Sequence, residues 1–224
     1  MDEMTPYYGA DGITIYHADC RDVFDEWEGL RTQSFDLGLT DPPYGIGFAA
    51  RPMHRQRSWG MVSQGWDTPI DRSVLTSLRH ISRFQIIWGG QYYAASLPES
   101  RCWLGWYKPD APPSMGSLEL AWTNLDRPPA CIVRSISATN GERVRHPTQK
   151  PLAVVRWALS CVPDVQSVLD PFMGSGTALV AARERGYAAV GIDSHEEYCE
   201  LAARRLSQMV LPLAYVEPVQ LEMR

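Results

Sequence analysis

The sequence lacks the segments that direct a chain to a membrane or across one. Met1 to Ala10 has neither a basic start nor an apolar core, so we expect no signal peptide. No apolar run approaches the roughly 20 residues that span a bilayer. We therefore expect a cytoplasmic chain with no membrane partner, whose 224 residues suit a single α/β domain.

Paired cysteines are also missing, which argues against a disulfide framework and against a zinc site. The five cysteines are odd in number, and no two of them form a C-x-x-C pair. They indicate reduced thiols rather than disulfides or zinc ligands, and we expect no metal.

Basic residues are in the minority overall, but they are unevenly spread. The net charge is -5, yet residues 42–150 hold 13 Lys and Arg against 7 Asp and Glu, and the remainder holds 8 against 19. A basic middle permits a polyanionic partner on one face. An ordinary solvated basic surface explains the same counts equally well, so charge alone leaves both interpretations open.

A stiff turn follows the short apolar strand that we predict at residues 35–40. In Asp41-Pro42-Pro43-Tyr44 the two prolines let neither a strand nor a helix continue. Open α/β sheets place their chemistry at the carboxyl ends of strands. A carboxylate, a fixed carbonyl and an aromatic ring at this place suit an exocyclic amine on a stacked base. An ordinary Pro-Pro turn with an exposed acid is the alternative.

The last third of the chain has the order strand, glycine turn, helix, strand, acid. A strand at 167–172 leads into Gly174-Ser175-Gly176, and after a helix at 178–185 the next strand, 187–192, ends on Asp193. This order is half of a nucleotide-binding α/β fold. Neither the third glycine of the nicotinamide fingerprint nor the lysine of a phosphate loop is present. We therefore expect a nucleoside ligand without a pyrophosphate, and S-adenosylmethionine fits that description.

Apolar patterns predict the remaining elements. We expect strands at 12–17, 84–88, 101–107, 118–122 and 130–136. We expect helices at 21–30, closed by Gly29, at 69–82, capped by Asp67 or Thr68, and at about 151–161. A last helix of some 15 residues is expected after Ser194 as its cap. Several successive strands in the middle of the chain indicate an antiparallel edge on a mostly parallel sheet. The fold class is therefore α/β.

Three motifs, in their order along the chain, carry a family resemblance. They are Asp41-Pro42-Pro43-Tyr44, His146-Pro147-Thr148-Gln149-Lys150-Pro151 and Asp170-Pro171-Phe172-Met173-Gly174-Ser175-Gly176-Thr177. Over residues 13–206 the chain resembles the beta class of DNA amino-methyltransferases, in which the catalytic half precedes the cofactor half. The resemblance implies a Rossmann-like, S-adenosylmethionine-dependent methyltransferase fold with circularly permuted motif order, in one domain over residues 1–224. Its expected parts are a catalytic strand pair and turn (12–44), a loop and edge-strand region for DNA recognition (45–145), the cofactor-binding half (146–208) and a tail (209–224).

The same resemblance implies a role for each motif residue. The expected cofactor ligands are Phe172, Gly174, Ser175, Gly176 and Thr177 at the methionine part with Asp170 nearby, Thr148 and Lys150 at its carboxylate, Asp193 at the ribose, and Asp19 with Cys20 at the adenine. Asp19 also fits a helix cap, and Lys150 also fits a surface residue at the start of a helix.

The loop that follows the turn is the expected contact with nucleic acid. Arg51, Arg55 and Arg57 lie in a basic and aromatic stretch that suits phosphates and unstacked bases, although an ordinary surface lid is the alternative. Double-stranded DNA is the expected partner. A homodimer and a cognate restriction enzyme are expected from the resemblance alone.

The implied reaction requires the target base to leave the duplex. Tyr44 would then stack on the base, Asp41 and Pro42 would hold its amine, and Pro43 would stiffen the turn for direct methyl transfer. Asp in the first position of the turn favours adenine N6 by family usage. Cytosine N4 is the alternative, and a non-catalytic DNA-binding subunit is the third hypothesis. None of the cysteines follows a proline, which argues against a covalent ring-carbon route.

Overall fold

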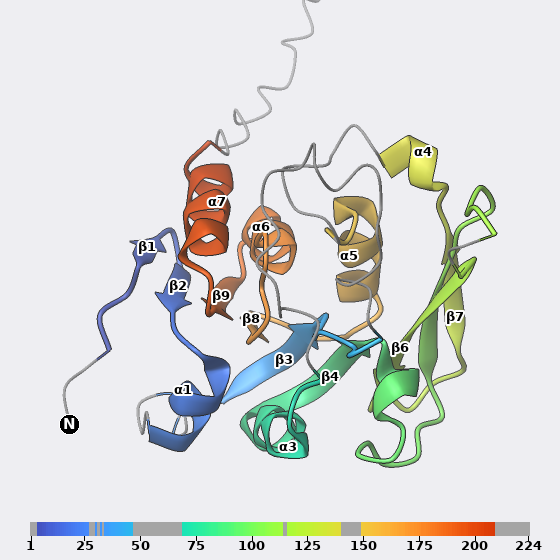
Figure 1. Cartoon of the computed structure of the whole chain (residues 1–224), viewed down its shortest axis with the longest axis horizontal. Coiled ribbons are helices and arrows are strands. Elements are labelled where there is room, and N and C mark those ends of the chain that lie inside the picture. Colours follow the sequence, from blue (N-terminus) through green and yellow to red (C-terminus); the bar gives the residue numbers. More distant parts are fainter. Residues whose placement is uncertain are drawn as a thin grey trace, which may run out of the picture.

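The computed structural model describes residues 4–26, 30, 32, 34–46, 69–113, 116–139 and 149–208. Within these residues nine strands form one sheet, in the order β1-β2-β9-β8-β3-β4-β6-β5-β7 (Figure 1). The strands are β1 Tyr8–Ala10, β2 Ile13–His17, β3 Phe35–Thr40, β4 Ser82–Trp88, β5 Trp103–Tyr107, β6 Leu118–Thr123, β7 Ala130–Val133, β8 Ser167–Asp170 and β9 Ala188–Asp193. The helices are α1 Cys20–Glu26, α3 Arg72–Ile81, α4 Ile136–Thr139, α5 Leu152–Ser160, α6 Thr177–Glu184 and α7 Glu196–Ser207, with a 3-10 turn, η2, at Gly90–Tyr93.

The centre of the sheet is parallel, as predicted. Strands β2, β9, β8, β3 and β4 run in one direction, and β6 pairs antiparallel with both β4 and β5. In the register of β3 on β8, Leu37 lies opposite Val168 and Gly38 opposite Leu169. Because parallel strands end at the same edge, the carboxyl ends of β2, β9, β8, β3 and β4 meet along one side of the sheet.

Helices cover both faces of this sheet, so apolar side chains are buried on both sides of its central strands. Helices α5, α6 and α7 lie on one face, and α1 and α3 lie on the other (Figure 1). In β8, Val168 packs into the core under the first set of helices and Leu169 into the core under the second, and both are fully buried. Where a parallel strand is buried on both faces, successive side chains are apolar, and the usual alternation of apolar and polar residues is lost. None of the helices in the described ranges has the length and apolar character that crossing a membrane requires.

The predicted elements all occur, but several of their ends were wrong. Helix α3 begins at Arg72 because the carboxylate of Asp71 caps it, accepting a hydrogen bond from Ser73 N at 2.8 Å. Asp67 and Thr68, the predicted caps, lie outside the described residues, and so does Gly29. Helix α7 has 12 residues, and its N-cap is His195 rather than Ser194.

Three short elements were not predicted at all: strand β1, helix α4 and the 3-10 turn η2. Strand β1 pairs with β2 through a turn in which Asp11 and Gly12 both have positive φ, and it spans only 3 residues. The strand predicted at 130–136 stops at Val133 and is followed by helix α4.

Candidate active site

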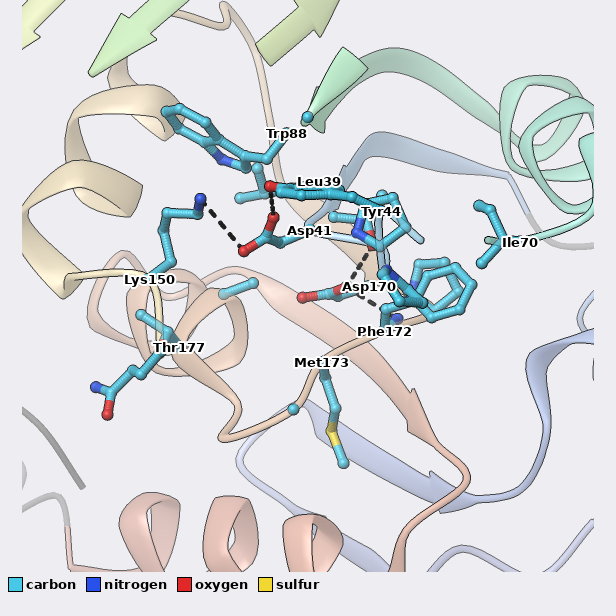
Figure 2. Close-up of a pocket in the computed structure, with 18 of the residues that line it drawn as sticks. Leu39, Asp41, Tyr44, Ile70, Trp88, Lys150, Asp170, Phe172, Met173 and Thr177 are labelled. Atoms are coloured by element: carbon cyan, nitrogen blue, oxygen red, sulfur yellow. Dashed lines mark hydrogen bonds and ion pairs between the residues drawn. The ribbon is translucent and has the colours of Figure 1, made fainter. Parts of the chain in front are cut away.

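A cavity of about 880 Å³ lies at the carboxyl ends of the central strands, and residues from both halves of the chain line it (Figure 2). The predicted site residues that line it are Asp19, Cys20, Asp41, Pro42, Pro43, Tyr44, Lys150, Asp170, Phe172, Gly174, Ser175, Thr177 and Asp193. Gly176 does not line the cavity, because it is the N-cap of α6 and its Cα faces Ala202. Thr148, Arg51, Arg55 and Arg57 lie outside the described residues.

The turn after β3 is held by the residues that follow β4. The hydroxyl of Tyr93 donates a hydrogen bond to the carbonyl of Pro43. The ring of Tyr44 stacks on Tyr92 with centroids 5.0 Å apart, and its hydroxyl donates to Asp41 Oδ1. Gly89 makes this possible, because a Cβ there would lie 2.0 Å from Tyr44 Cε1. The 3-10 turn η2 is thus part of the site, although no sequence pattern predicted it.

A buried hydrogen bond joins the two motifs. The hydroxyl of Thr40, the last residue of β3, donates to Asp170 Oδ1 at 2.9 Å, and the backbone N–H of Phe172 donates to the same oxygen at 3.1 Å. Asp170 is 5% exposed, and this burial raises the pKa of its carboxyl to about 7. Asp170 therefore fixes the start of the glycine loop against the end of β3.

The glycine loop is closed by the acid at the end of β9. Gly174 N donates to Asp193 Oδ2 at 3.0 Å, while His195 N donates to Asp193 Oδ1 at 2.9 Å. Gly176 has a φ of 72°, a conformation that favours glycine, and a Cβ there would lie 2.7 Å from Ala202 Cβ. The predicted contact of Asp193 with a ribose stays a prediction, but its carboxylate already shapes the loop.

Asp19 serves as a helix cap, one of the two roles considered for it. Its Oδ1 accepts from the backbone N–H of Arg21 at 2.9 Å and from Arg21 Nε at 2.9 Å. These hydrogen bonds hold the pKa of Asp19 below its usual range. The side chain still borders the cavity, with Cys20 buried beside it, so the predicted contact with adenine remains open to Asp19.

Four charged side chains gather beside the turn, two of which were not predicted from the sequence. Lys150 Nζ lies 2.5 Å from Glu119 Oε2 and 3.3 Å from Asp41 Oδ2, and Lys108 Nζ lies 2.7 Å from Glu119 Oε1. Glu119 stands between two leucines on β6, and a charged residue inside an apolar strand was the available signal. The predicted contact of Lys150 with the cofactor carboxylate stays a prediction, while its ammonium here is bound by two acids of the protein.

Comparisons with known proteins agree with this geometry. The sequence model of a family described as DNA methylase, covering N6- and N4-specific enzymes, matches residues 80–204. The type II methyltransferase M.ScaI of Streptomyces caespitosus is 26% identical over 258 residues, covering 90% of this chain and 83% of that protein. The solved structure of an M1.HpyAVI–SAM complex covers 86% of this chain and 99% of its own, with a TM-score of 0.59 and 22% identity. The match to the solved structure of the cytosine-N4-specific PvuII DNA methyltransferase covers 93% of this chain and 90% of that one, with a TM-score of 0.60 and 14% identity. Because the matched residues make up more than half of the chain, it belongs to the family of N6- and N4-specific DNA methylases.

Proposed function

We propose that the protein transfers a methyl group from S-adenosylmethionine directly to the N6 amino group of adenine in double-stranded DNA. The observation that carries this proposal is the meeting of the Asp41–Tyr44 turn and the glycine loop in one cavity, linked by the Thr40–Asp170 hydrogen bond. One motif suits an amine on a base and the other suits a nucleoside, so the reacting groups would share one space.

The residues of the cofactor half fit S-adenosylmethionine. The backbone of Gly174 and Ser175 lines the cavity beside the start of α6, where a helix favours a carboxylate. Asp193 ends β9, and Asp19 follows the end of the neighbouring parallel strand β2, at places suited to ribose hydroxyls and a base amino group. When bound, the cofactor supplies an electrophilic methyl group on a cationic sulfonium.

The turn after β3 would position the acceptor. Asp41 and the Pro42 carbonyl would accept the two N–H groups of the amine, which leaves the nitrogen lone pair directed at the methyl donor. Tyr44 would stack on the extruded base. Because the Tyr44 hydroxyl is bonded to Asp41 in this structure, that bond has to open when the amine arrives. The rate enhancement would come mainly from this positioning and from charge placed around the reacting atoms.

Two alternatives remain for the reaction. The likeness in fold to the cytosine-N4-specific PvuII enzyme favours cytosine N4 as the second candidate, since the same turn could hold either amine. A non-catalytic DNA-binding subunit would need neither an intact turn nor an intact glycine loop, and this chain has both. A homodimer and a cognate restriction enzyme remain expectations.

The test is methyl transfer from labelled S-adenosylmethionine to unmethylated duplex DNA, followed by digestion to nucleosides and mass analysis. The proposal predicts N6-methyladenine. N4-methylcytosine would keep the mechanism and change the acceptor. Calorimetry with S-adenosylmethionine provides the control for the enzyme class, because absence of binding with and without DNA would favour the non-catalytic subunit.

A further inference from the structure

Asp41 belongs to a cluster of four charged groups drawn from distant parts of the chain. Lys150, before α5, lies between Asp41 and Glu119, and Lys108, after β5, contacts the other oxygen of Glu119. The two lysine side chains are 9% and 4% exposed, while the two acids are 28% and 29% exposed. Two acids and two bases balance in charge, and each of the two nearly buried ammonium groups is paired with a carboxylate.

The position of Lys150 is determined by three neighbours. Its Nζ lies closer to Glu119 than to Asp41, at 2.5 Å against 3.3 Å. It also lies 4.6 Å from the ring centroid of Trp88, a distance at which the ring attracts a cation. Figure 2 shows Lys150 and Tyr44 directed at Asp41, with Trp88 beside the lysine.

These neighbours act on the ionisation of Asp41 in opposite directions. Burial raises the pKa of Asp41, the ammonium of Lys150 lowers it, and the carboxylate of Glu119 raises it. The hydroxyl of Tyr44 lowers it further by donating a hydrogen bond. Asp170, from β8, is also close enough for the charge of Asp41 to raise its pKa. On balance burial keeps the pKa of Asp41 above its usual value, and Lys150 is the cation that limits this rise.

The carboxylates of Asp41 and Glu119 in turn stabilise the charged form of Lys150. Burial alone would lower the pKa of Lys150, but the carboxylates of Asp41 and Glu119 outweigh it and raise the pKa above its usual range. Burial likewise acts to raise the pKa of Glu119, yet Lys150 and Lys108 lower it to about 2. Glu119 therefore stays ionised well below neutral pH.

We propose that Lys150 and Glu119 are positioning residues for the catalytic turn: Lys150 keeps the Asp41 carboxylate ionised and oriented, and Glu119 determines where the ammonium of Lys150 lies. The inference rests on the proposed function, since an ionised Asp41 matters because it accepts an N–H group of the target amine. On this inference Lys150 acts on the group that holds the acceptor base, and it does not bind the carboxylate of the cofactor.

The test compares variants that should shift the pKa of Asp41 in opposite directions. Lys150→Met keeps the apolar stem and removes the charge, so the acidic limb of the pH profile of kcat/KM for DNA should rise by about 1 to 3 pH units. Glu119→Gln removes the carboxylate that competes for Lys150, so the same limb should move down. Lys150→Arg retains the charge and should restore activity at low pH. The Kd for S-adenosylmethionine should change less than about threefold in all three variants.

A second readout does not require activity. Carbon-13 NMR of labelled aspartate carboxyls, with Asp41→Asn to assign the signal, measures the pKa of Asp41 directly in each variant. Should the wild type fail to methylate DNA, the proposed function fails while this titration still tests the cluster. Should Lys150→Met fail to fold, the downward shift expected in Glu119→Gln carries the test.

Two results would overturn the inference. One is a pKa of Asp41 that stays the same in the variants. The other is a tenfold or greater loss of S-adenosylmethionine binding in Lys150→Met with no shift of the pH profile, which would make Lys150 a ligand of the cofactor.

Discussion

Replacing Gly89 by alanine should disturb the Asp41–Tyr44 turn, although it replaces none of the residues of that turn. Gly89 has a φ of 67°, and an added Cβ would lie 2.0 Å from Cε1 and 2.5 Å from Cζ of Tyr44. Ordinary van der Waals contacts begin at 3.4 Å, so the tyrosine ring has to move by about 1.4 Å. Because Tyr44 is bonded to Asp41 and stacked on Tyr92, its displacement disturbs the whole turn.

The size of the effect follows from two costs. A side chain in the left-handed conformation costs roughly 1 to 2 kcal/mol. Inserting a methyl group into a packed site costs typically about 1 to 3 kcal/mol more. Gly89→Ala should therefore lower the free energy of unfolding by about 2 to 5 kcal/mol. A misplacement of about 1 Å at a reacting centre lowers the rate by about 100-fold, which is the decrease in kcat we expect.

Gly186 offers a matched control on the same chain. It has a φ of 72°, but nothing lies within 4 Å of the Cβ that alanine would add. Gly186→Ala should therefore incur only the conformational cost of roughly 1 to 2 kcal/mol and keep its activity. Urea unfolding and methyl transfer to DNA, measured on both variants, check the difference. Equal stability and equal activity in the two variants would refute the argument that Gly89 makes room for Tyr44.

Three further predictions concern single groups. Asp41→Ala should abolish methyl transfer and leave the affinity for S-adenosylmethionine within a few-fold by calorimetry, because its proposed bonds go to the base. Asp170→Asn should remove a pH-dependent decrease in stability. The Asp170 carboxyl keeps its proton to about pH 7 in the folded chain, whereas it releases the proton near pH 4 in the unfolded chain. Between pH 4 and pH 7 the free energy of unfolding of the wild type, measured in urea, should therefore fall by up to about 1.4 kcal/mol for each pH unit. Asp170→Asn should lack this decrease. Replacing Arg55 and Arg57 by alanine should weaken DNA binding and reduce the salt slope by about 0.9 for each phosphate that the protein no longer neutralises.

Each of these predictions has an outcome that contradicts it. Loss of cofactor binding in Asp41→Ala would mean that the two halves of the site are assigned the wrong way round. A stability difference between wild type and Asp170→Asn that stays constant from pH 4 to 7 would mean that Asp170 is ionised throughout. Arg101→Ala is the control for the DNA titration, because Arg101 is exposed at the opposite edge of the sheet. An equal salt slope in Arg101→Ala and the double variant would make the stretch that holds Arg51, Arg55 and Arg57 an ordinary surface loop.

The parts of the fold that could be predicted are those set by local patterns. The apolar run at 35–40 and the two prolines after it determine the strand and its end within one stretch of chain. The same holds for the glycine loop, where Gly176 with its positive φ opens α6 and the acid at 193 ends the next strand. In each case the physical cause lies within about 20 residues of its effect.

Contacts between distant elements were the parts that sequence patterns could not reveal. Glu119 binds a lysine 31 residues away, and Tyr93 holds the carbonyl of a proline 50 residues away. The start of α3 shows a different limit, since Pro69 is compatible with a first helical turn, yet Asp71 two residues later makes the cap. Asp67, Thr68 and Asp71 are all of residue types that cap helices, so residue type alone does not decide between them.

The pairing of β3 with β8 also bears on how the protein acquires its activity. Thr40 and Asp170 are 130 residues apart, and β2 pairs with β9 over a still longer separation, from Ile13 to Ala189. Pairings between such distant segments form slowly, because a long loop must close before any contact compensates for it. During synthesis the catalytic turn emerges from the ribosome long before its partner strands exist. On the proposed assignment the site is complete only after β9 has been made, so we expect a nascent chain that ends before β9 to be inactive.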